Sequence, residues 1–172
     1  MNKLRVGVVG ATGYTGEELV RILARHPQVE ITYVSGKEDR SEKIQDIFPY
    51  LRGKLDLPCN AFAADEAIEK TDLVFLCLPH TTSMSVAPLF LKADKKVIDV
   101  SADYRLQDTA QYEKFYKTAH LDTENLQHAV YGLPEMNRAK IKSAKLVANP
   151  GCYPTGAILG RMPGIKPGVF PR

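Results

Sequence analysis

Cys152 has the position in this 172-residue sequence that most directly indicates chemistry. It follows the turn Asn149–Gly151, which ends an apolar run, and it precedes a segment with helical character. A cysteine at a helix N-terminus meets the positive end of the helix dipole, which favours the nucleophilic thiolate. The alternative is a buried structural cysteine, the usual state of a free thiol. That alternative suits Cys77, which lies inside an apolar run, whereas Cys59 has no surrounding residues that suggest reactivity.

A glycine-rich segment at residues 10–16 indicates a second site. Its spacing is G-x-x-G-x-x-G, and it lies between an apolar strand-like run and an amphipathic helical pattern. Glycine allows a tight turn and a close approach to a pyrophosphate, and a helix N-terminus offers free N–H groups. The alternative is an ordinary glycine-rich connection between a strand and a helix. The strand and helix on either side favour nucleotide binding by this turn.

The end of the second strand bears on the choice between NAD and NADP. An acidic residue at that point would bond the ribose 2′-hydroxyl of NAD. The sequence has Ser35 and Lys37 there, and Glu38 follows only after the lysine. Ser35, Lys37 and Arg40 could hold the 2′-phosphate of NADP, or they could form a solvated charged loop. We expect the cofactor to be NADP.

A nicotinamide cofactor and an activated cysteine together define a type of reaction. The thiolate attacks an acyl carbon and forms a thioester, which divides one difficult step into two. Hydride from the nicotinamide then reduces the thioester to an aldehyde.

The elements that must position these residues alternate between strands and helices. Apolar runs predict strands at 4–9, 29–34, 73–78, 96–100 and 145–148, and helical periodicity predicts helices at 17–26, 65–70, 83–93 and from Cys152. The run at 73–78 does not alternate, which is typical of a strand covered on both faces. This order predicts an α/β fold with a Rossmann-like doubly wound parallel sheet. Residues 35–60 are expected to be irregular, and residues 103–145 to form an irregular insertion that faces a substrate.

The composition excludes several classes of protein. A content of 44% hydrophobic and 25% charged residues is ordinary for a globular domain and excludes disorder. The net charge of +3 is too small to indicate nucleic acid but suits an anionic small molecule. No apolar run reaches membrane-spanning length and no signal peptide is evident, so we expect a cytoplasmic chain without membrane contact. The three cysteines lack metal-like spacing, and no metal is expected.

Five segments together resemble the N-acetyl-gamma-glutamyl-phosphate reductases of arginine biosynthesis. The segments are Gly10-Ala-Thr-Gly-Tyr-Thr-Gly16, Leu78-Pro-His80, Asp99-Val-Ser-Ala-Asp-Tyr-Arg105, Tyr131-Gly-Leu-Pro-Glu135 and Ala148-Asn-Pro-Gly-Cys-Tyr-Pro-Thr155. The similarity covers residues 1–160, and the last three motifs in this order are highly specific. The resemblance implies NADPH-dependent reduction of N-acetyl-L-glutamyl 5-phosphate to N-acetyl-L-glutamate 5-semialdehyde, with release of phosphate when the cysteine thioester forms.

The resemblance also assigns roles to residues. Cys152 matches the nucleophile of the family, and the pyrophosphate turn corresponds to Gly10, Thr12, Gly13, Tyr14, Thr15 and Gly16. Ser35 and Arg40 lie where similar enzymes hold the 2′-phosphate. Arg105 is the candidate for a contact with a substrate anion, because a guanidinium forks well onto phosphate or carboxylate. An equally weighted alternative for Arg105 is a structural salt bridge with Asp99, Asp103 or Glu135.

Members of the family also have a second α/β domain, which supplies the acid/base histidine and the oligomer contacts. We therefore expect residues 1–150 to form the NADP-binding domain and residues 151–172 to be the truncated start of the catalytic region. The full-length form is expected to be a homo-oligomer, and this chain to turn over poorly. The glycine and proline content of residues 160–172 is expected to stop the helix from Cys152. His120 and His128 are expected at the surface.

Other functions are left open by the residues. Aspartate-semialdehyde dehydrogenases and N-acetyl-aminoadipyl-phosphate reductases share the turn and the cysteine chemistry. The motifs Ser101–Arg105 and Tyr131–Glu135 favour the glutamyl enzyme. A nucleotide-binding module without catalysis is the alternative from another class, and the reactivity of Cys152 distinguishes it from an enzyme.

Overall fold

The computed structural model describes residues 2–37 and 42–165, and within these ranges seven parallel strands form one sheet. The strand order is β3-β2-β1-β4-β5-β7-β6. The strands are β1 (Leu4–Val9), β2 (Val29–Gly36), β3 (Cys59–Ala61), β4 (Leu73–Leu76), β5 (Lys96–Asp99), β6 (Val130–Tyr131) and β7 (Leu146–Ala148). The predicted α/β fold with a parallel sheet is confirmed, while the short strands β3 and β6 were missed by the sequence pattern.

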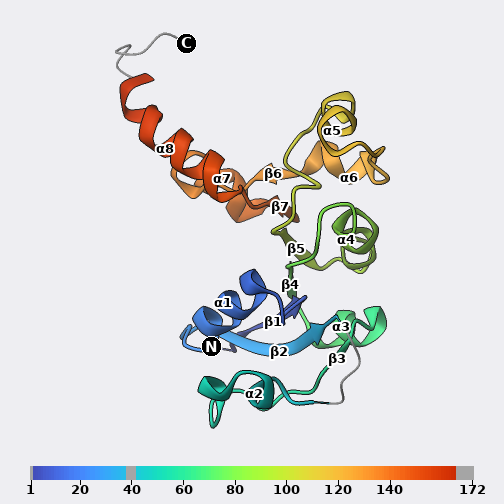
Figure 1. Ribbon diagram of the computed structural model, residues 1–172, viewed down its shortest axis with the longest axis vertical. Coiled ribbons are helices and arrows are strands. Elements are labelled where there is room, and N and C mark those ends of the chain that lie inside the picture. The colour runs from blue at the N-terminus through green and yellow to red at the C-terminus, as the bar shows by residue number, and fades with distance from the viewer. Residues whose placement is uncertain (1, 38–41, 166–172) are drawn as a thin grey trace.

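Helices cover the sheet from both sides. They are α1 (Tyr14–Leu23), α2 (Ile44–Ile47), the 3-10 helix η1 (Pro49–Leu51), α3 (Ala64–Lys70), α4 (Ser83–Lys92), α5 (Thr109–Tyr116), α6 (Thr123–His128), α7 (Pro134–Ser143) and α8 (Cys152–Ile165). Figure 1 shows α1 on one side of the sheet and α3 and α4 on the other. This arrangement is the doubly wound form that alternating strands and helices predict.

The central strand β4 contributes to a separate core on each side. Val74 and Leu76 are fully buried in the cluster that contains Phe90 of α4. Phe75 and Cys77 point the other way and pack against the cluster around α1. Because side chains of a strand alternate between faces, an uninterrupted apolar run is what a strand between two helical layers requires.

One row of register partners crosses the sheet where its strands end. Ser35 pairs with Val9, Val9 with Leu76, Leu76 with Asp99, and Asp99 with Ala148. Since all these strands are parallel, the segments that follow them emerge at the same edge. The glycine turn, the segment after β5 and the turn before Cys152 therefore share the carboxyl edge of the sheet, where open α/β sheets bind ligands.

The expectation that residues 35–60 and 103–145 are irregular is wrong. The first segment contains α2, η1 and β3, and the second contains α5, α6, β6 and α7. These helices are short, and side-chain caps stabilise two of them: Asp108 accepts from the N–H groups of Ala110 and Gln111, and Asp122 accepts from that of Asn125. Four to ten residues give too few turns for a clear helical period, so the pattern alone does not reveal them.

The glycine and proline content after residue 160 was expected to stop the last helix. This expectation is wrong for the residues up to Ile165, which are all helical. Helix α8 continues through Gly160 and Pro163, and residues 166–172 lie outside the described part. Intrinsic propensity is a weak determinant, and a single proline removes one helical hydrogen bond. Figure 1 shows α8 extending away from the sheet. None of the helices in the described ranges is long and apolar enough to cross a membrane.

Candidate functional site

The glycine turn lies between β1 and α1, where the strand order changes direction between β1 and β4. Gly10 has a φ of 83°, in the left-handed region that favours glycine. The N–H groups of Gly10 and Ala11 donate to the carbonyl oxygen of Ser35 at 3.0 and 2.8 Å. The turn is thereby attached to the end of β2, at the topological switch point of the sheet.

Two of the three glycines in the turn have no room for a side chain. A β-carbon on Gly10 would overlap the carbonyl oxygen of Cys77, and one on Gly16 would overlap that of Gly10. Gly13 differs, because its β-carbon would meet only the Gly10 oxygen at an ordinary 3.7 Å. Packing therefore explains why residues 10 and 16 are glycines. At Gly13 the lack of a side chain instead leaves the backbone open to a ligand.

The N-terminus of α1 is open to an anion. Gly13 is the N-cap and forms no side-chain cap, while the first N–H groups of a helix have no acceptor within the helix. Thr12, Tyr14 and Thr15 are exposed beside it. A helix N-terminus without a competing side chain fits the pyrophosphate of a dinucleotide. The structure thus brings the six predicted turn residues together.

The end of β2 differs from the sequence-based expectation. The side chain of Ser35 is fully buried, and its Oγ has no hydrogen-bond partner among the described residues. A phosphate cannot reach this hydroxyl unless the atoms that cover it move. Lys37 is exposed, and Arg40 lies outside the described residues. The roles of Ser35 and Arg40 at the 2′-phosphate stay predictions.

Cys152 is the first residue of α8, and it is exposed. The preceding turn is anchored at both ends, because the N–H of Asn149 donates to the carbonyl of Asp99 at 2.8 Å and the hydroxyl of Thr155 donates to that of Gly151 at 2.8 Å. The strand, turn and helix expected around Cys152 are all present. Strand β7 stands three positions from β1, which corresponds to roughly 14 Å along the sheet edge.

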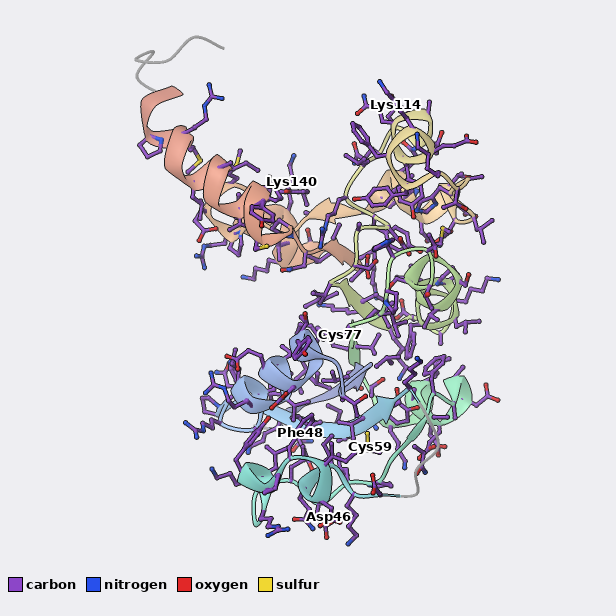
Figure 2. The ribbon with its side chains drawn as sticks, viewed as in Figure 1. Asp46, Phe48, Cys59, Cys77, Lys114 and Lys140 are labelled. Atoms are coloured by element: carbon purple, nitrogen blue, oxygen red, sulfur yellow. The ribbon has the colours of Figure 1, made fainter. Side chains whose placement is uncertain are left out.

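Of the other two cysteines, Cys59 is buried and Cys77 is half-buried. Figure 2 labels Cys59 and Cys77, which stand in β3 and directly after β4. Burial raises the pKa of the Cys59 thiol to about 11 and that of the Cys77 thiol to about 12. Both therefore remain protonated near neutral pH, and the structural interpretation of Cys77 extends to Cys59.

Arg105 does not form the salt bridge that the sequence left open. Its Nε donates to the carbonyl of Asn149 at 2.7 Å, and its Nη2 donates to that of Val100 at 2.8 Å. Across residues 2–37 and 42–165, no carboxylate forms an ion pair with this guanidinium. The contact with a substrate anion stays a prediction.

A buried polar network behind Arg105 was missed by the sequence analysis. Asp103 is fully buried and accepts from the N–H of Thr81 at 2.7 Å, the N–H of Met84 at 3.0 Å and the hydroxyl of Tyr112 at 2.8 Å. The network ties the segment after β4 to the segment after β5. The only local signal is the alternation of Asp99, Ser101, Asp103 and Arg105, which does not reveal their partners.

Asp99 is the other buried carboxyl group of this network. Its Oδ2 accepts from the hydroxyl of Ser101 at 2.8 Å, and its Oδ1 accepts from the N–H of the same residue at 3.0 Å. Burial raises the pKa of Asp99, and the hydrogen bonds from Ser101 oppose that rise. The charged form is thus disfavoured by desolvation and only in part restored by hydrogen bonding.

His120 is buried, so its expected surface position is wrong, while His128 is exposed as predicted. The Nδ1 of His120 accepts from the N–H of Asp122 at 3.1 Å, and its Nε2 lies 2.9 Å from the carbonyl oxygen of Asp103. A neutral ring that accepts at Nδ1 donates from Nε2, which satisfies both contacts. His120 therefore belongs to the same network as Asp103.

A polar cavity of about 490 Å³ lies beside Arg105. Its wall includes His128 and Tyr131 together with Asn137 and Lys140 of α7, and Figure 2 labels Lys140. The amide of Asn137 donates to the carbonyl of Tyr131 at 3.0 Å, at a point where α7 is kinked. The region expected to face a substrate thus contains a cavity, although Cys152 is not part of its wall.

The sequence is similar to curated reductases over nearly its whole length. It is 50% identical over 163 residues to the N-acetyl-gamma-glutamyl-phosphate reductase of Geobacter sulfurreducens and 49% identical over 169 residues to that of Herminiimonas arsenicoxydans. These matches cover 95% and 97% of this chain but 47% and 48% of the relatives. The chain therefore spans about half the length of the curated relatives it matches, and the resemblance predicted from five motifs is confirmed.

Solved structures support the fold. An aspartate semialdehyde dehydrogenase with NADP from Candida albicans has a TM-score of 0.66 at 16% identity, covering 98% of this chain and 48% of that one. The aspartate semialdehyde dehydrogenase II of Vibrio cholerae, complexed with ASA, has a TM-score of 0.65 at 17% identity, covering 96% and 47%. At these identities the likeness establishes the fold alone.

The match to a protein family covers most of the chain. Residues 5–144 match the model described as the semialdehyde dehydrogenase, NAD binding domain. This range includes the glycine turn, the buried network and Arg105, and it ends just before β7. The chain therefore belongs to the semialdehyde dehydrogenase family, as an NAD binding domain.

Proposed function

We propose that this chain supplies the nucleotide-binding and nucleophilic part of an NADPH-dependent N-acetyl-gamma-glutamyl-phosphate reductase. The observation that carries the proposal is the position of Cys152, exposed at the start of α8 on the same sheet edge as the glycine turn. About 50% identity to reductases of this name supports the choice of substrate, N-acetyl-L-glutamyl 5-phosphate.

In the proposed reaction the Cys152 thiolate attacks the acyl carbon of the substrate. A carbon–sulfur bond forms, the bond from that carbon to the phosphate oxygen breaks, and orthophosphate leaves with the electron pair. A nicotinamide held by the glycine turn would supply hydride, which converts the thioester to N-acetyl-L-glutamate 5-semialdehyde and releases the Cys152 thiolate. Cys152 is the first residue of α8, so the positive end of the helix dipole lies where the sulfur carries negative charge before the attack and after the aldehyde departs.

The glycine turn supports binding of NADP. Gly13 and the free N–H groups at the start of α1 would hold the pyrophosphate, with Thr12, Tyr14 and Thr15 around it. The exposed Lys37 at the end of β2 offers a positive charge for the 2′-phosphate. A positive charge there favours NADP over NAD, whereas an acidic residue would repel the additional phosphate.

We further propose that residues 1–150 form the NADP-binding domain and that residues 151–172 begin the catalytic region. The acyl phosphate is a small-molecule partner, and the proposal involves neither nucleic acid nor membrane. A cytoplasmic location and a homo-oligomeric full-length form belong to the same proposal. Sedimentation velocity on the form with a second domain tests the oligomer, which a single monomeric species would contradict.

The half-reaction at Cys152 tests the activity directly. The 172-residue chain is mixed with N-acetyl-L-glutamyl 5-phosphate without NADPH, and phosphate release and protein mass are followed together. We expect a burst of up to one phosphate per chain and an acyl adduct on Cys152, both absent from Cys152→Ser. A wild-type chain that releases no burst of phosphate would contradict the proposal.

Competing substrates distinguish the neighbouring activities. A larger burst with aspartyl phosphate or N-acetyl-aminoadipyl phosphate than with the glutamyl compound would assign the chain to one of those enzymes instead. NADPH binding without any acylation would indicate a non-catalytic module. Steady turnover is expected to be low, because general acid–base help is worth about 10²–10⁴-fold and none of the four histidines in this sequence clearly matches the acid/base histidine of the family. Turnover at the rate of a complete reductase would overturn that expectation.

A further inference from the structure

Arg105 bridges the ends of two neighbouring strands. Its Nε donates to the carbonyl of Asn149, the first residue after β7, at 2.7 Å. Its Nη2 donates to the carbonyl of Val100, the first residue after β5, at 2.8 Å. β5 and β7 are paired in the sheet. One guanidinium therefore joins the two backbone segments that leave the sheet at this point.

The same guanidinium also faces the residue before Cys152. A β-carbon on Gly151 would lie 3.0 Å from the Nη1 of Arg105, which is closer than side chains normally pack. The carbonyl of Gly151 accepts from both the N–H and the hydroxyl of Thr155, at 3.1 and 2.8 Å. The turn before Cys152 is thus held by Arg105 on one side and by the first turn of α8 on the other.

The chemistry of this contact is specific to arginine. A guanidinium donates in several fixed directions within one plane, so it can reach two carbonyl oxygens at once. A lysine at the same place would keep the positive charge, but its single ammonium group does not reproduce the fork. A residue that acts only by charge on an anion would therefore tolerate lysine, whereas a residue that spans two carbonyls would not.

We propose that Arg105 is a positioning residue for Cys152. By holding the carbonyls of Asn149 and Val100, it fixes the turn that starts α8 and so fixes where the sulfur meets the helix N-terminus. This inference rests on the proposed function of Cys152, and it differs from the expected role of Arg105 as a contact for a substrate anion. A small displacement of a reacting atom is enough to lower a rate severalfold to a hundredfold.

Alkylation of Cys152 by iodoacetamide separates the two roles, because this reagent carries no charge for Arg105 to bind. The rate is measured by mass spectrometry on the 172-residue wild-type chain, Arg105→Lys and Arg105→Ala. We expect both variants to react more slowly by about tenfold, since the sulfur is no longer held at the helix N-terminus. A wild-type rate in Arg105→Lys would overturn the proposal and leave a role by charge alone.

Rescue by a small molecule provides the second readout. Added guanidinium chloride, far below denaturing concentrations, is expected to restore part of the rate in Arg105→Ala, whereas ammonium chloride at the same concentration is not. Equal effects of the two salts would count against a forked contact. NADPH affinity, which depends on the distant glycine turn, reports whether each variant is folded. If Arg105→Ala does not fold, Arg105→Lys decides alone.

The outcomes also separate this inference from the proposed function. A wild-type chain that is acylated by the substrate, together with an Arg105→Ala variant that alkylates at the wild-type rate, would reject the positioning role and keep the enzyme. A wild-type chain that is never acylated, but whose alkylation slows in both variants, would reject the proposed reaction and keep the positioning role.

Discussion

Gly16, in the first turn of α1, lies so close to the carbonyl oxygen of Gly10 that a β-carbon on Gly16 would overlap it. The other atoms in its way are the Cα and carbonyl carbon of Ala11, which also belong to the backbone. Backbone atoms cannot rotate aside as the end of a side chain can. This contact therefore determines how closely the N-terminus of α1 approaches the end of β1.

We predict that Gly16→Ala destabilises the chain by about 1–3 kcal/mol and weakens NADPH binding. The added methyl group forces either the turn or the helix to move, as overpacking does in a tight core. Urea unfolding measures the loss of stability, and a fluorescence titration with NADPH measures affinity. A midpoint equal to that of the wild type would contradict the packing argument.

The matched variant Gly13→Ala separates packing from ligand approach. Its β-carbon meets only ordinary contact, so the free energy of unfolding is expected to stay within about 0.5 kcal/mol of the wild type. NADPH affinity is expected to fall nevertheless, because the methyl group stands at the open N-terminus of α1. Unchanged affinity in Gly13→Ala would rule out a pyrophosphate at this turn.

We predict that iodoacetamide modifies only Cys152 in the native chain near neutral pH. Burial raises the pKa of Cys59 to about 11 and that of Cys77 to about 12, and Cys59 is also enclosed while Cys77 is half-buried. At about pH 8 a thiol of pKa 11 is ionised to about one part in a thousand. Mass spectrometry is expected to find one modified cysteine in the native chain and three in urea.

The variant Cys152→Ser is the control for this labelling experiment. It is expected to remain unmodified when native and to gain two modifications in urea. Rapid labelling of Cys77 in either native chain would contradict the raised pKa of its thiol.

We predict that Asp103→Ala lowers the free energy of unfolding by roughly 3 kcal/mol or more. The change leaves three donors without their acceptor, namely the N–H groups of Thr81 and Met84 and the hydroxyl of Tyr112. The donors on Met84 and Tyr112 are buried, and each buried donor left unpaired costs about 1–3 kcal/mol. Urea unfolding at neutral pH measures the effect.

Tyr112→Phe provides the comparison, because it removes one donor and leaves the carboxylate with two N–H partners. Its expected cost is about 1 kcal/mol, and Asp103→Ala should cost less in the Tyr112→Phe background than in the wild type. Strict additivity of the two changes would mean that the hydroxyl and the carboxylate do not interact.

We predict that Asp99 lowers stability as the pH rises. Burial raises its pKa in the folded state above the ordinary 3.8, so the folded chain binds a proton more tightly than the unfolded chain. Between pH 3.8 and the raised pKa, stability must therefore fall with increasing pH, at a limiting slope of about 1.4 kcal/mol per pH unit. The unfolding free energy of the wild type minus that of Asp99→Asn should therefore decrease as the pH rises through this range.

Ser101→Ala tests the cause of this pH dependence. The Ser101 hydroxyl donates to Asp99 and opposes the rise of its pKa, so its removal should extend the decline of stability to higher pH. Urea unfolding at a series of pH values follows both variants. If the decline of stability ended at a lower pH in Ser101→Ala than in the wild type, the assigned hydrogen bond would be contradicted.

Elements built from neighbouring residues were predicted well. The run at 4–9 became β1 with the same bounds, and the helix expected at 65–70 became α3 from Ala64 to Lys70. Other ends moved by a few residues: α1 starts at Tyr14 rather than 17 and ends at Leu23 rather than 26, and β2 extends through Gly36. Short helices such as α6 were missed, because their stability comes from caps and packing more than from a long periodic face.

The sequence by itself determined the chemistry that is available: a glycine turn between a strand and a helix, a cysteine at a helix start, and the motifs of a reductase family. These features depend on residues close together in the chain, where local geometry follows from residue type. Only the tertiary structure decided which groups meet. Arg105 binds a carbonyl 44 residues away, His120 is enclosed with Asp103, and the hydroxyl of Ser35 is buried. Such contacts depend on strand order and long-range packing, which local periodicity does not encode.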